Sequence, residues 1–359
     1  MSSSNLVLKG LFVDPQGLPT RSGSHLSLDT PLLFLGLTLS RCCNYRCRYC
    51  AQEAGRPAPQ EVSGATLREL IREGADLGVQ SVILAGAGEP LLDPAFHDVV
   101  RTTAELGLTT VLYTNGSQIS PAVGEFLYTH DVSISLKLDT LDESCFNWLT
   151  GCHDGFRRTM RGLENLFAVG YGERECLPDG HSMTRLAVNA VVTCANLSDL
   201  IDLARYCDQL GIKLFLDNLS LVGRAADNWR DLITTPKEYL EACAKINSSL
   251  GYEAVGHSLD RAEACILWQY GIVIYFDGEA RVCYDDPAIP RIGSIYEHPL
   301  KELVSLKQRL HPPMQSDIDC PLKCALRERL WRKVGSTLPG PEAAACFGKL
   351  AAIQQFESA

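Results

Sequence analysis

The sequence predicts an α/β protein built on a parallel β-sheet, and three observations lead to that prediction. First, the 359 residues are 46% hydrophobic and 21% charged, so the chain can bury a full core. Second, helical patterns alternate with apolar runs typical of buried strands. Third, the alternation repeats about six times, which implies right-handed crossovers between parallel strands. The expected strands lie at 32–39, 80–86, 108–113, 132–138, 186–193 and 213–219.

Residues 1–30 are an N-terminal extension that precedes the first expected strand. Lys9, Gly10 and Asp14 interrupt its apolar residues, so it lacks the unbroken apolar stretch of a secretion signal. The longest apolar run, PLLFLGLTL, has about half the length of a membrane span. We therefore expect a cytoplasmic protein with no membrane partner.

Residues 31–235 form the main expected domain, with its helices between the strands. The helical patterns cover 66–78, 95–107, 155–170 and 197–211. A linker helix is expected within 236–264, where TPKEYLEACAKINSSLG has a helical pattern.

The last hundred residues change to short strands and loops. A second domain is expected at 265–335, and residues 336–359 form a tail. The stretch GIVIYFDGEARVC carries Asp277-Gly278 between two β-rich arms, which predicts a hairpin because that dipeptide is favoured in tight turns.

Charge and cysteine content narrow the classes of partner and cofactor. The formal charge is −10 and there is no basic run, which counts against nucleic acid as a partner. An acidic protein suits a neutral or cationic substrate better. The chain has 15 cysteines, which a reducing cytosol keeps as thiols, so metal or cluster ligation becomes their leading use.

The loop SRCCNYRCRYC follows the first expected strand and carries the densest group of thiols. Cys43, Cys47 and Cys50 have the spacing C-x3-C-x2-C, whereas Cys42 does not fit it. In parallel α/β folds, ligands bind at the carboxyl ends of the strands, where this loop begins. Three thiolates can bind three irons of a [4Fe-4S] cube and leave the fourth iron open, whereas zinc would normally need a fourth protein ligand.

These residues, with AGAGEP after the second strand, resemble the radical S-adenosylmethionine (SAM) superfamily. The resemblance implies a partial (β/α)6 barrel of the TIM type, and a cluster whose open iron chelates the methionine end of SAM, which is then cleaved to a 5′-deoxyadenosyl radical. It also implies that Tyr49 packs on adenine. Exposed backbone groups of Ala87, Gly88 and Glu89 would bond the methionine amino group, with Ala87 standing where the family commonly has glycine.

Later strands add further positions that the resemblance assigns to SAM. Asn115 lies in YTNG after the third strand, and Ser133 and Ser135 lie in SISLK in the fourth, where the family contacts ribose and carboxylate. The two serines share one face of their strand, so both can point into the barrel. Asn189, in LAVNAVVT, is carried over in the same way.

The C-terminal cysteines resemble a twitch domain, the shorter form of the SPASM auxiliary-cluster extension. Cys265, Gly278 and Cys283 match its first half, and CPLKC adds Cys320 and Cys324. The resemblance implies a second, auxiliary [4Fe-4S] cluster on Cys265, Cys283, Cys320 and Cys324, and leaves Cys346 unassigned.

The resemblance does not fix the reaction. No N-terminal peptide-recognition domain precedes the first strand, which favours a small molecule, and the alcohol dehydrogenases of aminoglycoside assembly, including the spectinomycin pathway, are the nearest in kind. The expected function is oxidation of a secondary alcohol in an amino-sugar or aminocyclitol substrate, with a flavodoxin- or ferredoxin-type electron donor. Epimerisation of a similar sugar and modification of a peptide or protein side chain remain open.

Two aspartates are candidates for handling the substrate. If the strand of the hairpin continues past Cys283, alternation puts Asp285 on the same face as that cysteine, beside the auxiliary cluster. Asp285 is therefore the expected catalytic base for the hydroxyl proton. Asp139, at the end of the fourth strand, is the expected partner of a protonated substrate amine.

Overall fold

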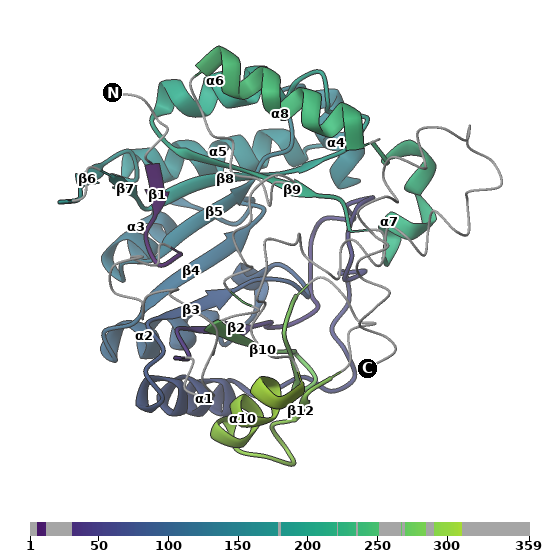
Figure 1. Ribbon diagram of the computed structural model, residues 1–359. Coiled ribbons are helices and arrows are strands. Elements are labelled where there is room, and N and C mark those ends of the chain that lie inside the picture. Colours follow the sequence, from purple (N-terminus) through teal and green to yellow (C-terminus); the bar gives the residue numbers. More distant parts are fainter. Residues whose placement is uncertain are drawn as a thin grey trace, which may run out of the picture.

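The computed structural model describes residues 6–11, 31–178, 181–220, 222–234, 236–250, 267, 270–284 and 291–310. Their main feature is a nine-stranded sheet in the order β12-β11-β10-β2-β3-β4-β5-β8-β9 (Figure 1). Its six consecutive barrel strands run parallel. They are β2 (Phe34–Leu37), β3 (Ser81–Leu84), β4 (Thr109–Thr114), β5 (Ser133–Lys137), β8 (Leu186–Val192) and β9 (Lys213–Asn218). The α/β class and the partial six-stranded barrel are therefore confirmed.

Helices follow the strands and cover the outer face of the sheet (Figure 1). They are α1 (Gly64–Asp76), α2 (Phe96–Glu105), α3 (Pro121–Thr129), α4 (Glu143–Thr150), α5 (Gly155–Ala168), α6 (Leu200–Leu210) and α8 (Pro236–Leu250). The sequence analysis did not identify α3 and α4. They have only 9 and 8 residues, too few for a clear helical period.

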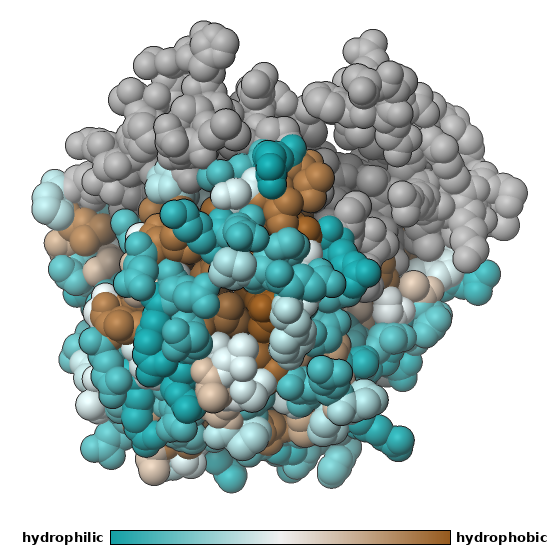
Figure 2. Space-filling model, turned by 90° about the horizontal axis from the view of Figure 1, so that it is seen from below, coloured by the Kyte–Doolittle hydropathy of each residue, from teal (hydrophilic) through white to brown (hydrophobic). Residues whose placement is uncertain are grey.

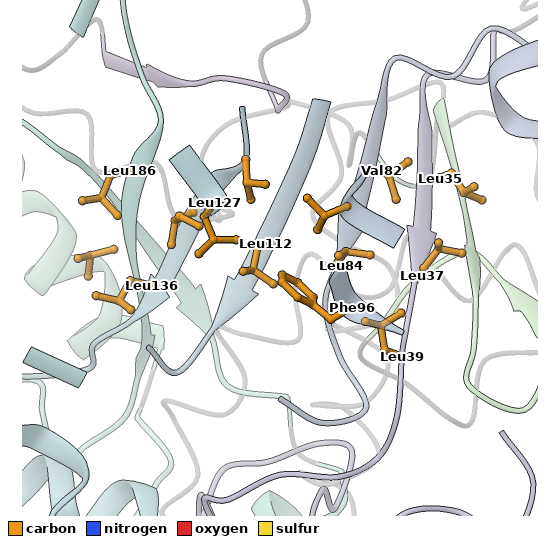
Figure 3. Close-up of a cluster of buried hydrophobic side chains, with 14 of the residues drawn as sticks. Leu35, Leu37, Leu39, Val82, Leu84, Phe96, Leu112, Leu127, Leu136 and Leu186 are labelled. Atoms are coloured by element: carbon orange, nitrogen blue, oxygen red, sulfur yellow. The ribbon is translucent and has the colours of Figure 1, made fainter. Parts of the chain in front are cut away.

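The outer core forms because alternate strand residues point toward the helices. Leu37, Leu84, Leu112 and Leu136 come from four neighbouring strands and are completely buried. Figure 3 shows these leucines in a row across the sheet, with Phe96 of α2 beside Leu84 and Leu112. The other residues of each strand line the barrel interior.

The interior is filled by a second apolar group, the interior cluster. It contains Leu8, Leu33, Phe34, Ile83, Ala85, Val111, Ala187, Val273, Tyr275 and Tyr284. Leu8 belongs to β1 (Leu6–Leu8), which pairs with β7 (Ser182–Thr184), and β7 pairs with β6 (Arg174–Cys176). A Cβ on Gly10 would lie 2.7 Å from Val111 and 2.8 Å from Thr109, so residues 6–11 lie against the amino ends of the strands.

The sheet continues beyond β2 into the C-terminal part of the chain. β10 (Gly271–Ile274) pairs in parallel with β2, and β11 (Glu279–Arg281) turns back along β10. The expected hairpin is confirmed, with Gly278 at φ +86° in its turn. β12 (Gly293–Ser294) and α10 (Leu300–Leu310) follow. The hairpin is therefore an extension of the barrel sheet.

The described surface is mainly polar. Figure 2 shows a largely hydrophilic face with smaller apolar patches. Large hydrophobic side chains exposed among the described residues are Leu106, Trp148, Tyr296 and Leu310. Within the described ranges, every helix is too short or too polar to cross a bilayer.

Candidate active site at the carboxyl ends of the barrel strands

The cysteine loop, residues 41–56, leaves the carboxyl end of β2 and is fixed on both sides. The N–H groups of Arg46 and Arg48 donate to the carbonyls of Thr150 and Leu149, at 2.9 and 2.8 Å. The buried Tyr45 hydroxyl donates to the Gly155 carbonyl at 2.9 Å. The end of α4 and the start of α5 therefore hold the loop over the barrel.

The thiols of Cys43, Cys47 and Cys50 are half-buried and close enough to influence one another. Burial raises the pKa of the Cys43 thiol to about 11 and also raises that of Cys47, and charge on Cys50 adds to both shifts. In the described parts of the chain, no three acidic, histidine or cysteine side chains converge on one ion. A cube does not require that convergence, because each thiolate binds a different iron. The donor set fits a cube with one open iron.

The AGAGEP turn after β3 packs directly under the cysteine loop. A Cβ on Gly88 would lie 2.2 Å from the Cys42 carbonyl oxygen and 2.5 Å from that of Ser40, so only glycine fits there. The Glu89 N–H donates to the same Cys42 carbonyl at 2.8 Å. The cysteine loop therefore uses the Glu89 N–H, and the expected contact of backbone groups of Ala87 to Glu89 with the methionine amino group, which would need their carbonyl oxygens as acceptors, stays a prediction. Ala87, with φ +48°, is also buried.

The Glu89 side chain joins the ends of β3 and β4. Its carboxylate accepts from the Thr114 hydroxyl at 2.7 Å, from the Asn115 N–H at 2.8 Å and from the Leu91 N–H at 3.2 Å. Burial raises the pKa of Glu89, although these donors oppose the shift. The Asn115 amide donates to the Asn44 side chain at 2.9 Å, so Asn115 lies beside the cysteine loop, and its expected contact with SAM stays a prediction.

A polar network crosses the carboxyl end from the cysteine loop to β9. The Tyr49 hydroxyl donates to Asp139 at 2.5 Å, and Lys137 pairs with Asp139 at 2.7 Å. Lys137 also lies 5.0 Å from the centre of the Tyr49 ring and 3.3 Å from the Asn189 side chain. Asn189 in turn donates to Asp217 at 2.7 Å. Burial, followed by the charge of Asp139, raises the pKa of Tyr49.

The expectation that Asp139 meets a cationic substrate is wrong. Asp139 is 0% exposed. Its carboxylate already forms an ion pair with Lys137 and accepts hydrogen bonds from the Tyr49 hydroxyl and the Val191 N–H. The partner of the carboxylate is a cation of the chain itself, Lys137, the last residue of β5 and two residues earlier in the sequence.

The two predicted serines face the barrel interior. Ser135 is in register with Tyr113 and Ala187, and Ala187 belongs to the interior cluster. Ser133 and Ser135 are buried, and neither hydroxyl has a hydrogen-bond partner within the described chain. Buried hydroxyls without partners are rare, so these two fit a polar group that the protein alone does not supply.

The hairpin brings Cys283 to the barrel. However, the argument for Asp285 required the strand to continue past Cys283, and it does not. β11 ends at Arg281, and the chain bends at Val282 and Tyr284, so strand alternation does not continue past Cys283. The reason is the Tyr284 hydroxyl, which turns inward and donates to the Ile83 carbonyl at 2.6 Å. Asp285 lies outside the described residues, as do the other three predicted auxiliary ligands, Cys265, Cys320 and Cys324.

Several site residues were missed from the sequence. Asp217 is the last but one residue of β9, and this position near the strand end was a usable signal. Tyr284 carried no local signal, because its hydroxyl bonds Ile83, which is distant in sequence.

Comparison with known proteins agrees with the site. Residues 37–178 match the Radical SAM superfamily. The chain is 30% identical over 209 residues to the mycofactocin maturase MftC of Mycobacterium ulcerans, covering 58% of this chain and 53% of that protein. It is 34% identical over 143 residues to GTP 3′,8-cyclase of Pasteurella multocida, covering 38% and 42%. The chain thus spans about half the length of the curated relatives that it matches.

Solved structures share the fold at low identity. SuiB of Streptococcus suis bound to S-adenosylmethionine aligns with a TM-score of 0.62 at 18% identity, covering 83% of this chain and 68% of SuiB. The structure of anSMEcpe with bound AdoMet aligns at 0.59 and 15% identity, covering 84% and 97%. Residues 37–178 therefore resemble the Radical SAM superfamily, and the described chain shares the partial-barrel fold of these solved structures.

Proposed function

We propose that this chain is a radical SAM enzyme that binds a [4Fe-4S] cluster through Cys43, Cys47 and Cys50. The observation that carries the proposal is the packing of the cysteine loop on Gly88, at the carboxyl ends of parallel strands. When bound, such a cluster would supply a binding site for SAM and the electron for its reductive cleavage to a 5′-deoxyadenosyl radical.

The chain's own residues would orient SAM around that cluster. Tyr49, whose hydroxyl donates to Asp139, would pack its ring on the adenine. The Ser133 and Ser135 hydroxyls, which have no hydrogen-bond partner among the described residues, suit the ribose or carboxylate oxygens. Gly88, Glu89 and Asn115 contact the cysteine loop and Ala87 lies beside them, whereas Asn189 lies between Lys137 and Asp217.

For the substrate, the leading proposal is oxidation of a secondary alcohol in an amino-sugar or aminocyclitol. The carbinol carbon would lose a hydrogen atom to the radical, and the hydroxyl would lose its proton to a base. Cys265, Cys283, Cys320 and Cys324 would hold an auxiliary [4Fe-4S] cluster, which would supply the acceptor for the remaining electron. Cys283 supports this arrangement, because its neighbour Tyr284 bonds both β3 and, through its carbonyl, Gln52 of the cysteine loop. Reduced flavodoxin or ferredoxin would supply the electron for SAM cleavage.

A second candidate is modification of a peptide side chain. It is favoured by the similarity to a mycofactocin maturase and by the shared fold with SuiB, whose structure is also known with the precursor peptide SuiA. The structure of anSMEcpe is likewise known with the Cp18Cys peptide.

Iron content tests the cluster assignment. Anaerobic reconstitution should load about eight irons per chain, four for each cube. The triple Cys43, Cys47 and Cys50→Ala variant should lose half of that iron and all SAM cleavage, whereas Cys283→Ala should lose only the other half. Cys207→Ala, in the buried face of α6, is the matched control and should retain both clusters. Wild-type protein that stays at four irons contradicts the auxiliary assignment, and protein that binds none contradicts the whole proposal.

Product analysis separates the substrate classes. The loaded enzyme should release 5′-deoxyadenosine and remove two hydrogens from an aminocyclitol, as read by mass spectrometry. Solvent deuterium at an inverted carbon would instead identify an epimerase, because the returned hydrogen would come from a thiol. Turnover of serine or cysteine peptides, with no aminocyclitol product, would establish the second candidate.

A further inference from the structure

The segment that follows β9, residues 223–228, packs against the cysteine loop. α7 (Arg224–Asp227) begins directly after Gly223, and its first residue makes three contacts with the loop. The Arg224 N–H donates to the Cys50 carbonyl at 3.0 Å. Its guanidinium donates through Nε to the Cys47 carbonyl and through Nη1 to the Ala54 carbonyl, each at 2.9 Å. One arginine therefore binds both ends of the Cys47–Cys50 turn.

The approach of this segment is too close for any other residue at position 223. Gly223 has φ +57°, and a Cβ there would lie 2.5 Å from the Ala51 carbonyl oxygen and 2.7 Å from that of Cys50. Asn228, one turn later, donates to the Arg48 carbonyl at 3.3 Å and to the Arg224 carbonyl at 2.8 Å. Backbone fit and side-chain contacts thus hold the two segments together.

The turn that Arg224 binds sets the separation of two predicted cluster ligands. The Cys50 N–H donates to the Cys47 carbonyl at 3.2 Å, so this carbonyl accepts from the turn and from Arg224 together. On the opposite side, Tyr49 within the same turn is bonded to Asp139. The turn is held between two anchors, Asp139 just after β5 and Arg224 at the start of α7.

We propose that Arg224 is a positioning residue, which fixes the Cys47–Cys50 turn for the cluster and places a permanent positive charge beside it. The proposal rests on the cluster assignment made above. A guanidinium is always charged and presents its donors in a rigid fork, which suits two carbonyls 7 residues apart, those of Cys47 and Ala54. Positive charge near a cluster favours its reduced, more negative state, because net charge and hydrogen bonding set cluster potentials.

Three variants separate the geometric effect from the charge effect. Arg224→Met removes the fork and the charge, whereas Arg224→Lys keeps the charge without the fork. Arg230→Met is the matched control, because Arg230 follows in the same segment with its guanidinium over Trp229, 4.9 Å from the ring centre. Thermal unfolding monitored by circular dichroism checks that each variant is folded.

The readouts are iron release to a chelator from the reconstituted chain, and the electron paramagnetic resonance of the reduced cluster with and without SAM. Arg224→Met should release iron about tenfold faster and show about a tenfold lower ratio of reduced to oxidised cluster at a fixed potential, which is 59 mV for one electron. Arg224→Lys should release iron faster than wild type but keep that ratio. Arg230→Met should match wild type in both measurements.

The result that overturns the inference is an Arg224→Met chain with wild-type iron release and a wild-type reduced fraction. If Arg224→Met does not fold, the Arg224→Lys variant tests the inference in its place. Wild-type iron release in Arg224→Lys would then overturn the inference. Wild-type protein that binds no iron at Cys43, Cys47 and Cys50 would contradict the proposed function instead, so the two failures are distinguishable.

Discussion

The two ends of the barrel interior are built from the same strands but have opposite chemistry. At the amino end, residues 6–11 close the barrel with Leu8, which is 2% exposed and packs in the interior cluster. At the carboxyl end, Lys137, Asp139 and Asn189 form hydrogen bonds and ion pairs that reach the cysteine loop. Position along a strand, rather than the face of the sheet, decides whether a side chain serves stability or the site.

The largest expected effect comes from Gly88 at the carboxyl end. Gly88→Ala should abolish SAM cleavage, because its Cβ would lie 2.2 Å from a backbone oxygen, which cannot rotate away. The measurement is 5′-deoxyadenosine release together with iron content. Gly124→Ala, within α3, is the control, since its Cβ would meet its nearest atom at an ordinary 3.5 Å. Full activity in Gly88→Ala would show that the two loops are not packed as described.

Leu8→Ala tests the amino end. Removing a buried leucine should lower the free energy of unfolding by about 2–5 kcal/mol, measured by urea denaturation. SAM cleavage per folded chain should be unchanged, because Leu8 lies at the end away from the cysteine loop. Leu106→Ala is the control, because Leu106 is 40% exposed. This change should lower the free energy of unfolding by less than about 0.5 kcal/mol. A loss of SAM affinity in Leu8→Ala would contradict the claim that the amino end contributes only to stability.

Asp139→Asn tests the ion pair at the carboxyl end. It should destabilise the fold by about 2–3 kcal/mol, below the range for a fully buried pair, because the Lys137 side chain is 21% exposed. It should also weaken SAM binding, since Tyr49 loses its charged acceptor. The double variant with Lys137→Met should regain part of the stability, because no unpaired cation is left. Additive effects of the two changes would contradict the pairing.

Tyr171→Phe is expected to have the smallest effect, at the amino end. The Tyr171 hydroxyl donates to the Val132 carbonyl at 2.7 Å, and its loss should cost about 1 kcal/mol. Burial raises the pKa of Tyr171, so its contribution to stability is complete below about pH 10. Above that pH the unfolded chain ionises first, and stability falls. The variant should therefore lose stability less steeply than wild type above pH 10, as measured by denaturation at several pH values.

The sequence predicted the barrel well because its signals are local. Each expected strand overlaps an observed one, since an apolar run between turn residues is visible within ten positions. The C-x3-C-x2-C loop and the Asp277-Gly278 turn are equally local. Helix α4 was not predicted, because its 8 residues are too few to show a clear helical period. The placement of Asp285 relied on a strand that stops at Arg281, where Tyr284 turns into the barrel instead of extending the ladder.

By itself, the sequence determined the strand order, the ends at which loops emerge and the residue types that each loop carries, because hydrophobic period and turn chemistry act over a few residues. Only the tertiary structure decided which of these groups meet. Asp139 binds Lys137 rather than facing a substrate, and β10 joins the edge of β2. Arg224 reaches the carbonyl of Cys47 across 177 positions of chain. Contacts of that separation depend on how packed elements bring backbones together, and no local pattern encodes them.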